Sequence, residues 1–170
     1  GSSQNDHFWG GEGRDTFNGM GGFAGIRFDR QFTNANMVGV NVDLSRATGQ
    51  MINDGFGNTE TATNIEWVQG SYRADRLKGN AGGNFLEGGD GADTLIGGAG
   101  ADSFYWDNSD EIGPIDVITD FVRGADKLEF NAPGFDGMTT TVRLVNGTAA
   151  TIAQGQFIFN ASNHILYWDA

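Results

Sequence analysis

Aspartate recurs at one fixed place within three short glycine-rich segments of the sequence. The segments begin at Gly10, Gly88 and Gly97, and each follows Gly-Gly-x-Gly-x-Asp-x-apolar-x, where x is any residue. Glycine tolerates the positive φ angles of a tight turn, so a short run can turn with its carbonyl oxygens pointing inward. Carboxylate and carbonyl oxygens are hard ligands that suit calcium far better than zinc or copper. The residue types at this spacing therefore favour a calcium site.

Weaker copies of the nine-residue segment lie in phase with the three clear ones. They occupy residues 1–9, 19–27, 70–78 and 79–87, and each retains part of the pattern. Asp6 and Asp75 keep the aspartate, whereas Asn84 replaces it. Residues 70–105 therefore form four consecutive nonapeptides. Repetition at a fixed period indicates a solenoid.

Each nonapeptide supplies half of one coil of such a solenoid. Its x-apolar-x part is a short strand with one side chain facing inward, and two nonapeptides complete an 18-residue coil. Coils stack at about 4.8 Å, the spacing of neighbouring strands. Residues 18 positions apart therefore lie one above the other. We expect Asp75 to stack with Asp93, Asn84 with Asp102, and Asp102 with Asp120.

Stacked carboxylates repel one another, and carbonyl oxygens aimed into the same gap have no donor. A cation in the gap removes both penalties. Two carboxylates and about four carbonyls supply the six or so oxygens that calcium takes, in a flexible geometry that magnesium tolerates poorly. Folding and calcium binding are therefore expected to be coupled, with the calcium-free chain largely disordered.

The repeats resemble those of the RTX (hemolysin-type) family of proteins, which bacteria export by type I secretion. The resemblance implies an all-β fold, a right-handed parallel β-roll (β-solenoid) with a small C-terminal antiparallel β cap, and the binding of several Ca2+ ions. In that family each ion is held by carbonyls two and four and the aspartate of one repeat. Carbonyls one and three and the aspartate of the repeat two further on complete the site.

Carried onto this sequence, the resemblance implies two complete sites. The first comprises Ser71, Arg73, Asp75, Gly88, Asp90 and Asp93. The second comprises Asn80, Gly82, Asn84, Gly97, Ala99 and Asp102, and its asparagine lowers the charge of the site. The remaining expected ligand and ligand-loop residues are Asp6, Gly11, Gly13, Asp15, Gly89, Gly91, Gly98, Gly100 and Asp120. In the first block Ala24 stands where the partner of Asp6 is expected and Thr33 stands opposite Asp15, which weakens both sites.

The repeats predict two regions in the chain. We expect the β-roll over residues 1–106, with an inserted polar loop near 45–63, and a capping region over 107–170. One continuous roll is favoured over two short rolls, which would add two open ends. The stretch from Asp116 to Phe130 resembles the segment after the roll in many RTX proteins, including serralysin-type metalloproteases. Further strands are expected at 141–145, 157–159 and 165–168, with a turn at 160–164, and their apolar residues would cover the last coil.

Charge and composition exclude several functional classes. The 170 residues include 22 acidic and 10 basic residues, a net charge of -12, so no nucleic-acid or anionic-membrane partner is expected. No apolar run reaches the length of a membrane-spanning helix. Cysteine is absent, and so are the motifs H-E-x-x-H, G-x-S-x-G and the phosphate loop. We therefore expect a module that is not an enzyme.

Three functions remain, all extracellular or at the cell surface. The favoured one is a calcium-binding RTX module of an exported bacterial protein, which folds on calcium outside the cell, supports secretion through the type I machinery and stabilises the attached protein. The first alternative is a polysaccharide-binding or targeting module, like those of alginate epimerases, with Arg73, Arg76 and Lys78 as contacts. The second is a calcium-stiffened segment of a surface adhesin.

Overall fold

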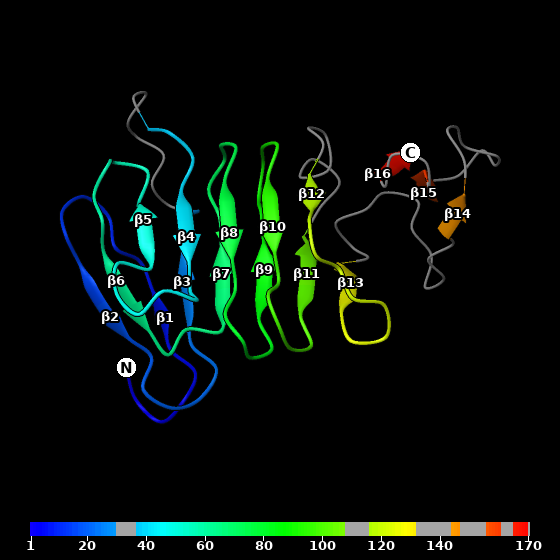
Figure 1. The fold of residues 1–170 in the computed structure, drawn as a ribbon. Helices are drawn as coiled ribbons and strands as arrows, with labels where there is room; N and C mark the ends of the chain where they lie inside the picture. Colours follow the sequence, from blue (N-terminus) through cyan, green and yellow to red (C-terminus); the bar gives the residue numbers. More distant parts are fainter. Residues whose placement is uncertain (30–36, 108–115, 132–143, 147–155, 161–164, 170) are drawn as a thin grey trace.

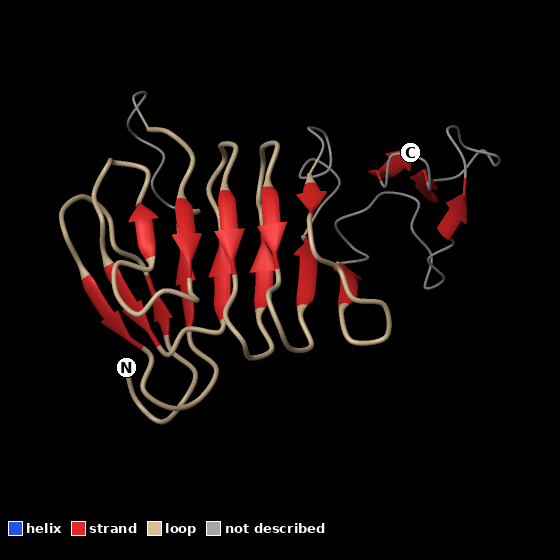
Figure 2. Ribbon diagram, viewed as in Figure 1, coloured by secondary structure: helices blue, strands red, loops and turns tan. Residues whose placement is uncertain are grey.

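The computed structural model describes residues 1–29, 37–107 and 116–131, and the backbone of three further strands at 144–146, 156–160 and 165–169. These residues form strands, turns and loops, and no helix occurs among them (Figure 2). The described part of the chain therefore holds no helix that is long and apolar enough to cross a membrane. The all-β fold class that the repeats predicted is confirmed.

One face of the molecule is a parallel sheet with the strand order β1-β3-β7-β9-β11-β13. Its strands are β1 (His7–Phe8), β3 (Gly25–Arg27), β7 (Trp67–Gln69), β9 (Phe85–Glu87), β11 (Ser103–Trp106) and β13 (Lys127–Phe130). Neighbouring strands in this sheet come from successive coils, so the chain leaves the sheet after each strand and returns one coil later (Figure 1).

The other face is built from the strands that lie between these in the sequence. A sheet of order β12-β10-β8-β4-β5 comprises β12 (Val117–Ile118), β10 (Thr94–Ile96), β8 (Arg76–Lys78), β4 (Asn41–Asp43) and β5 (Met51–Asn53). A separate parallel pair comprises β2 (Thr16–Asn18) and β6 (Thr61–Thr63). Two faces linked coil by coil make a parallel β-roll, as predicted.

The four nonapeptides of residues 70–105, which we call the regular coils, stack with the predicted 18-residue register. Leu77 pairs with Leu95, and Leu86 pairs with Phe104. All four side chains are fully buried, which places one inward residue per strand in a continuous core. Burial of each such side chain contributes about 1.5–3 kcal/mol to folding. Because most of these strands supply a single inward apolar residue, the core is narrow and depends on the stacking of many coils.

The coils outside this block, which we call the flanking coils (residues 1–69 and 116–130), keep the same stacking across insertions. Ile26 of β3 pairs with Val68 of β7, 42 residues later. Phe17 of β2 pairs with Ala62 of β6, 45 residues later. The intervening segments leave the roll and return to it in register. Among the described residues, strands from both sides of the insertions therefore belong to the same sheets.

The interval 45–63 is not the plain polar loop that the sequence predicted. It contains β5 and β6; β5 runs antiparallel to β4, and Met51 forms an antiparallel bridge with Glu60. Met51 and Ala62 are buried in the core. The expectation was wrong because each of these strands has three residues and one buried apolar side chain, too short for hydropathy alternation to reveal.

The roll also continues past residue 106, where the sequence placed its end. β12 pairs in parallel with β10, and β13 pairs in parallel with β11, so each face gains one more strand. Ile118, Leu128 and Phe130 pack against the core. The loss of glycine after Tyr105 thus marks a change of loop type and not the boundary of the roll.

The C-terminal part contains a small separate sheet. β14 (Leu144–Asn146) pairs in parallel with β15 (Gln156–Asn160), and β15 pairs antiparallel with β16 (Ile165–Asp169). Strands expected at 157–159 and 165–168 are present, and the sheet is mixed rather than wholly antiparallel. The expected strand residues 141–143 and turn residues 161–164 lie outside the described residues, and the capping role stays a prediction.

Candidate metal sites

The turns of the regular coils contain glycines with positive φ angles. Gly89 and Gly98, at the second repeat position, have φ of 88° and 98°. Gly91 and Gly100, at the fourth position, have φ of 135° and 122°. This region of backbone conformation strains every residue except glycine. The glycine pattern therefore fixes the turn shape that orients the backbone carbonyls.

Carbonyl oxygens of one turn approach the glycines of the neighbouring coil. A Cβ atom at Gly89 would collide with the carbonyl oxygen of Ser71, and one at Gly91 would collide with that of Arg73. The same approach joins the carbonyl of Asn80 to Gly98, of Gly82 to Gly100, of Gly88 to Gly70 and of Gly97 to Gly79. These are six of the carbonyls that the RTX resemblance implies as calcium ligands. Because glycine has a hydrogen atom in place of a side chain, these carbonyl oxygens have room between the coils.

A side-chain carboxylate lies immediately before most strands and accepts a hydrogen bond from the coil before it in the sequence. Asp93 Oδ1 accepts the backbone N–H of Asp75 at 2.8 Å, and Asp102 Oδ1 accepts that of Asn84 at 2.8 Å. We call the full set of these contacts the carboxylate ladder. Its pairs, amide first, are Val40–Asp75, Asp75–Asp93, Asp93–Asp116, Asn84–Asp102, Asp102–Asp126, Asp15–Glu60 and Ala24–Glu66.

The ladder carboxylates of the regular coils are buried. Asp102 is 1% exposed, and its Oδ2 has no hydrogen-bond partner among the described residues. Burial raises the pKa of Asp102, and the charges of Asp126 and Asp120 raise it further. Burial also raises the pKa of Asp75 to about 6, although it accepts hydrogen bonds from Ser71 and Val40. An unpartnered buried polar atom costs about 1–3 kcal/mol. The gaps between coils therefore favour a bound cation.

The donor set of these gaps suits calcium. Each gap between regular coils combines ladder side chains with backbone carbonyls, so all potential ligands are oxygens. The described residues contain no group of three or more His, Cys, Asp or Glu side chains that could hold a metal ion. An ion here must therefore take much of its coordination from the backbone, which is possible for calcium.

The same loops match a known family. Residues 1–23 and 69–104 match the RTX calcium-binding nonapeptide repeat, in 4 copies. This part of the chain is an RTX calcium-binding domain. The RTX repeat is a structural, calcium-binding module, and RTX repeats occur in secreted bacterial proteins. A comparison with curated proteins found no match.

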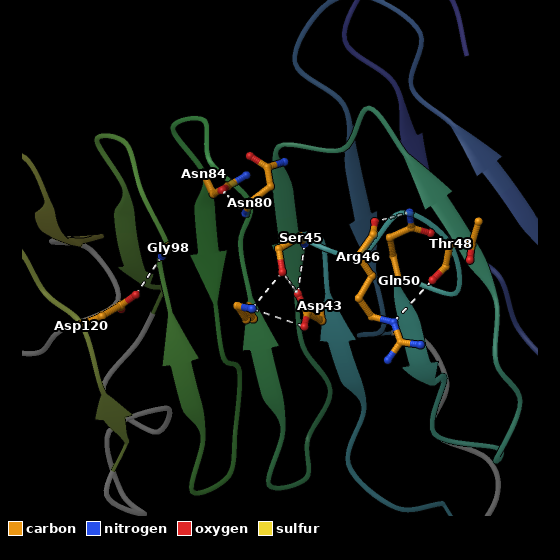
Figure 3. A network of polar contacts seen from close by, with 10 residues as sticks. Asp43, Ser45, Arg46, Thr48, Gln50, Asn80, Asn84, Gly98 and Asp120 are labelled. Carbon is orange, nitrogen blue, oxygen red and sulfur yellow. Dashed lines mark hydrogen bonds and ion pairs between the residues drawn. The ribbon is translucent and has the colours of Figure 1, made fainter.

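Asn84 occupies an RTX aspartate position and forms a different set of contacts. Its Oδ1 accepts the backbone N–H of Asn80 at 2.8 Å (Figure 3). Its Nδ2 donates to the carbonyl of Glu66 at 3.3 Å. Asp75, one nonapeptide earlier, instead accepts from both the backbone N–H and the hydroxyl of Ser71. The amide of Asn84 thus supplies a donor where aspartate supplies only acceptors. We expect the RTX site that contains Asn84 to hold calcium more weakly.

Asp120 does not stack with Asp102, and that prediction was wrong. One carboxylate oxygen accepts the backbone N–H of Gly98 at 2.8 Å (Figure 3). The other accepts the backbone N–H of Gly97 at 2.9 Å. Asp126 accepts the N–H of Asp102 at 3.0 Å instead. The coil after Asp102 is 24 residues long rather than 18, so an extrapolation at constant period reached the wrong aspartate.

Sequence reasoning missed four ladder residues, namely Glu60, Glu66, Asp116 and Asp126. Asp116 accepts the Asp93 N–H at 2.9 Å and the Trp106 indole N–H at 2.8 Å. Burial raises its pKa to about 6. A signal for all four was present, because each stands two residues before an inward apolar residue. The nonapeptide has the same spacing, but the glycine pattern before these four residues is incomplete.

The first RTX block differs from the regular coils around its glycines. Gly11 and Gly13 have φ of 88° and 120°, but no atom lies within 4 Å of a Cβ built on either. Asp6 Oδ2 accepts the backbone N–H of Ser2 at 2.5 Å. Asp15 faces Glu60 across the ladder, and its expected neighbour Thr33 lies outside the described residues. The open side of this loop leaves the Asp6 and Asp15 positions less enclosed than those of the regular coils.

Proposed function

We propose that this chain is a calcium-dependent folding module of an exported bacterial protein. The chain stays unfolded where calcium is scarce and folds outside the cell, which supports its secretion and stabilises the protein attached to it. The observation that carries this proposal is the buried carboxylate ladder, in which Asp102 Oδ2 lacks a partner. A net charge of -12 disfavours the compact state further until cations bind.

The ligands in this proposal come from two regular gaps. Ser71, Arg73, Gly88 and Asp90 contribute carbonyls, and Asp75 and Asp93 contribute carboxylates. In the second gap Asn80, Gly82, Gly97 and Ala99 contribute carbonyls, and Asn84 and Asp102 contribute side-chain oxygens. Bound calcium supplies the positive charge that the stacked oxygens lack. The chain itself supplies the turn geometry, through Gly89, Gly91, Gly98 and Gly100.

Far-UV circular dichroism during a calcium titration, starting in EDTA, tests the proposal. We expect a cooperative gain of β signal with calcium and none with magnesium at the same concentration. A chain that is fully folded in EDTA and indifferent to calcium would contradict it.

A pair of charge-matched variants connects the response to the ladder. Asp102→Asn keeps an oxygen that can accept the Asn84 N–H but removes the buried charge, so we expect the calcium midpoint to rise about tenfold, equivalent to about 1.4 kcal/mol. Glu12→Gln removes one charge from an exposed turn and should leave the midpoint unchanged. Equal midpoints for the two variants would show that total charge, and not the ladder, sets the response.

The polysaccharide and adhesin alternatives stay predictions. Of the expected sugar contacts, Arg73 and Arg76 are exposed on the surface. Lys78 Nζ instead contacts Asp43 Oδ2 at 3.4 Å and Ser45 Oγ at 2.8 Å. Retention of the calcium-loaded chain on immobilised alginate would support the first alternative.

A further inference from the structure

A small pocket opens at one edge of the roll, where three strands end. β4, β6 and β8 end at Asp43, Thr63 and Lys78, and the residues at or just after these ends line the pocket. Its volume is about 240 Å³. Pockets for drug-sized ligands usually hold about 300–1,000 Å³. The pocket therefore suits a smaller ligand, about the size of a single sugar ring.

Part of the lining is apolar and belongs to the core. Leu44, Ala62 and Ile65 line the pocket, and all three are buried. Their aliphatic groups are rigid, because each also packs in the continuous core of the roll. A sugar ring has a face of C–H groups, which loses little when it leaves water for such a surface. This wall therefore provides a contact for one face of a ring.

The polar side chains around the pocket are held in place. Gln50 is buried, and its Nε2 donates to the carbonyl of Arg46 at 2.8 Å (Figure 3). Gln50 Oε1 accepts the backbone N–H of Ala62 at 3.1 Å. Asn64 has a positive φ of 54°, and its Nδ2 donates to Asn18 Oδ1 at 2.8 Å. These contacts fix both side chains in advance, which lowers the entropy cost of binding a ligand.

Amide and hydroxyl groups in the lining suit a ligand with several hydroxyls. Thr63, Asn64 and Asn80 all line the pocket, and each both donates and accepts hydrogen bonds. Asn80 Oδ1 accepts the backbone N–H of Gly82 at 2.7 Å, whereas its Nδ2 makes only a long contact of 3.5 Å with the carbonyl of Ile65. The second N–H of this amide is therefore available to a ligand.

The pocket is positive although the chain is strongly acidic. Arg46 is the only charged residue in its lining, while the net charge of the chain is -12. The ion pairs among the described residues are Arg27–Asp29 and Lys78–Asp43, so neither involves Arg46. Its Nε donates to the carbonyl of Thr48 at a long 3.4 Å (Figure 3). A guanidinium binds a carboxylate through two parallel hydrogen bonds, so Arg46 favours a carboxylate in the pocket.

We propose that this pocket binds one acidic sugar unit, a ring that carries a carboxylate. The carboxylate pairs with Arg46, and the ring hydroxyls bond to Asn64 and Asn80. The surface residues Arg73 and Arg76, which the sequence predicted as sugar contacts, do not line this pocket. The site goes beyond the proposed function, because it requires the folded roll and not a particular cause of folding.

NMR titration of the isotope-labelled whole chain with glucuronate, in saturating calcium, tests the site. We expect the side-chain amide signals of Gln50, Asn64 and Asn80 to shift and saturate, in about the millimolar range for a ligand of this size. Glucose lacks the carboxylate and acetate lacks the ring, so each should bind at least about tenfold more weakly. Binding of acetate as tight as that of glucuronate, or no shift of these signals, would overturn the proposal.

Three variants separate the pocket from the charge of the surface. Arg46→Gln should weaken glucuronate binding at least about tenfold and leave glucose binding unchanged. Ala47→Leu fills the pocket at an exposed lining residue and should weaken both. Arg76→Gln is the matched control, because it removes the same charge from an exposed site on β8 outside the pocket, and glucuronate binding should persist.

Circular dichroism in calcium should show that all three variants fold. Equal weakening by Arg46→Gln and Arg76→Gln would show that net charge attracts the ligand, and would overturn the site. Glucuronate binding that Ala47→Leu leaves unchanged would overturn it as well. Neither result would affect the calcium response of the chain, so the proposed function is tested separately.

Discussion

The regular coils and the flanking coils form the same hydrogen bond from amide to carboxylate with different sequences. In the regular coils, successive ladder residues Asp75 and Asp93 are 18 residues apart and sit in glycine-rich turns. In the flanking coils the separations are 23 residues from Asp93 to Asp116 and 45 from Asp15 to Glu60. The hydrogen bond from amide to carboxylate is nevertheless the same. The register of the roll is therefore set by this contact and by the inward apolar residue, and not by the length of chain between them.

The core of the regular coils should be the most sensitive to truncation. Leu86 is fully buried, whereas Leu128, in the last flanking coil, is half-buried at the edge of the same core. Leu86→Ala should lower the free energy of unfolding in saturating calcium by about 2–5 kcal/mol, and Leu128→Ala by clearly less. Urea denaturation of both variants measures the difference. Equal losses would mean that the last flanking coil is packed as tightly as the regular ones.

Glycine substitution separates backbone strain from crowding between coils. Gly89 and Gly11 occupy the same repeat position with the same φ of 88°, so Gly→Ala adds about 1–2 kcal/mol of strain in either. Only at Gly89 would the new Cβ also collide with the carbonyl of Ser71. Gly89→Ala should therefore be the more destabilising by at least about 1 kcal/mol, and should weaken calcium binding.

The calcium midpoint and urea midpoint of both variants test this. If Gly11→Ala destabilises the protein as much as Gly89→Ala does, the first RTX loop is packed against another coil in the calcium-bound state. That result would make the two regions more alike than their glycines indicate.

Acid should partly replace calcium in both regions. The folded-state pKa values of Glu60, Asp75 and Asp116 are about 7, 6 and 6, above their ordinary values of 4.5, 3.8 and 3.8. The folded roll then binds more protons than the unfolded chain, so in EDTA its stability should rise as pH falls from about 7 towards 4.5. Circular dichroism in EDTA should show β signal growing over this window.

Glu60→Gln sharpens this test, because it removes the group with the highest of these pKa values. Its gain of β signal should begin at lower pH than that of the parent chain. A parent chain whose signal is flat between pH 7.5 and 5 would falsify the link between buried carboxylates and folding.

The ion pair that joins the two regions should matter least. Lys78, in a regular coil, lies 3.4 Å from Asp43 of the neighbouring flanking coil, and both side chains are partly exposed. Solvent-exposed pairs contribute about 0–1 kcal/mol. Lys78→Gln should therefore shift the urea midpoint only slightly, with the effect disappearing at high salt. A larger loss would indicate that the contact with Ser45 Oγ, at 2.8 Å, carries the connection between regions.

The regular coils were predictable from sequence and the flanking coils only in part. Glycine, aspartate and an apolar residue in phase specify turn, ladder and core together, so the pairing of Leu77 with Leu95 followed directly. Glu60 and Asp126 lie after insertions, and a nine-residue period does not predict the length of an insertion. The spacing of an acidic residue two positions before an inward apolar one was visible at both, but it is too short to be specific alone.

The carboxylate ladder has a direction. In every pair the amide belongs to the earlier coil and the carboxylate to the later one, from Val40 and Asp75 to Asp102 and Asp126. A folded stretch therefore presents unsatisfied acceptors at the end nearer the N-terminus and unsatisfied donors at the other. Growth of the roll towards the N-terminus meets acceptors already in place, whereas growth towards the C-terminus must bring a new carboxylate with each coil. The two ends of a folded stretch are therefore chemically different templates for the next coil. The order in which segments of the chain become available for folding decides which end is extended.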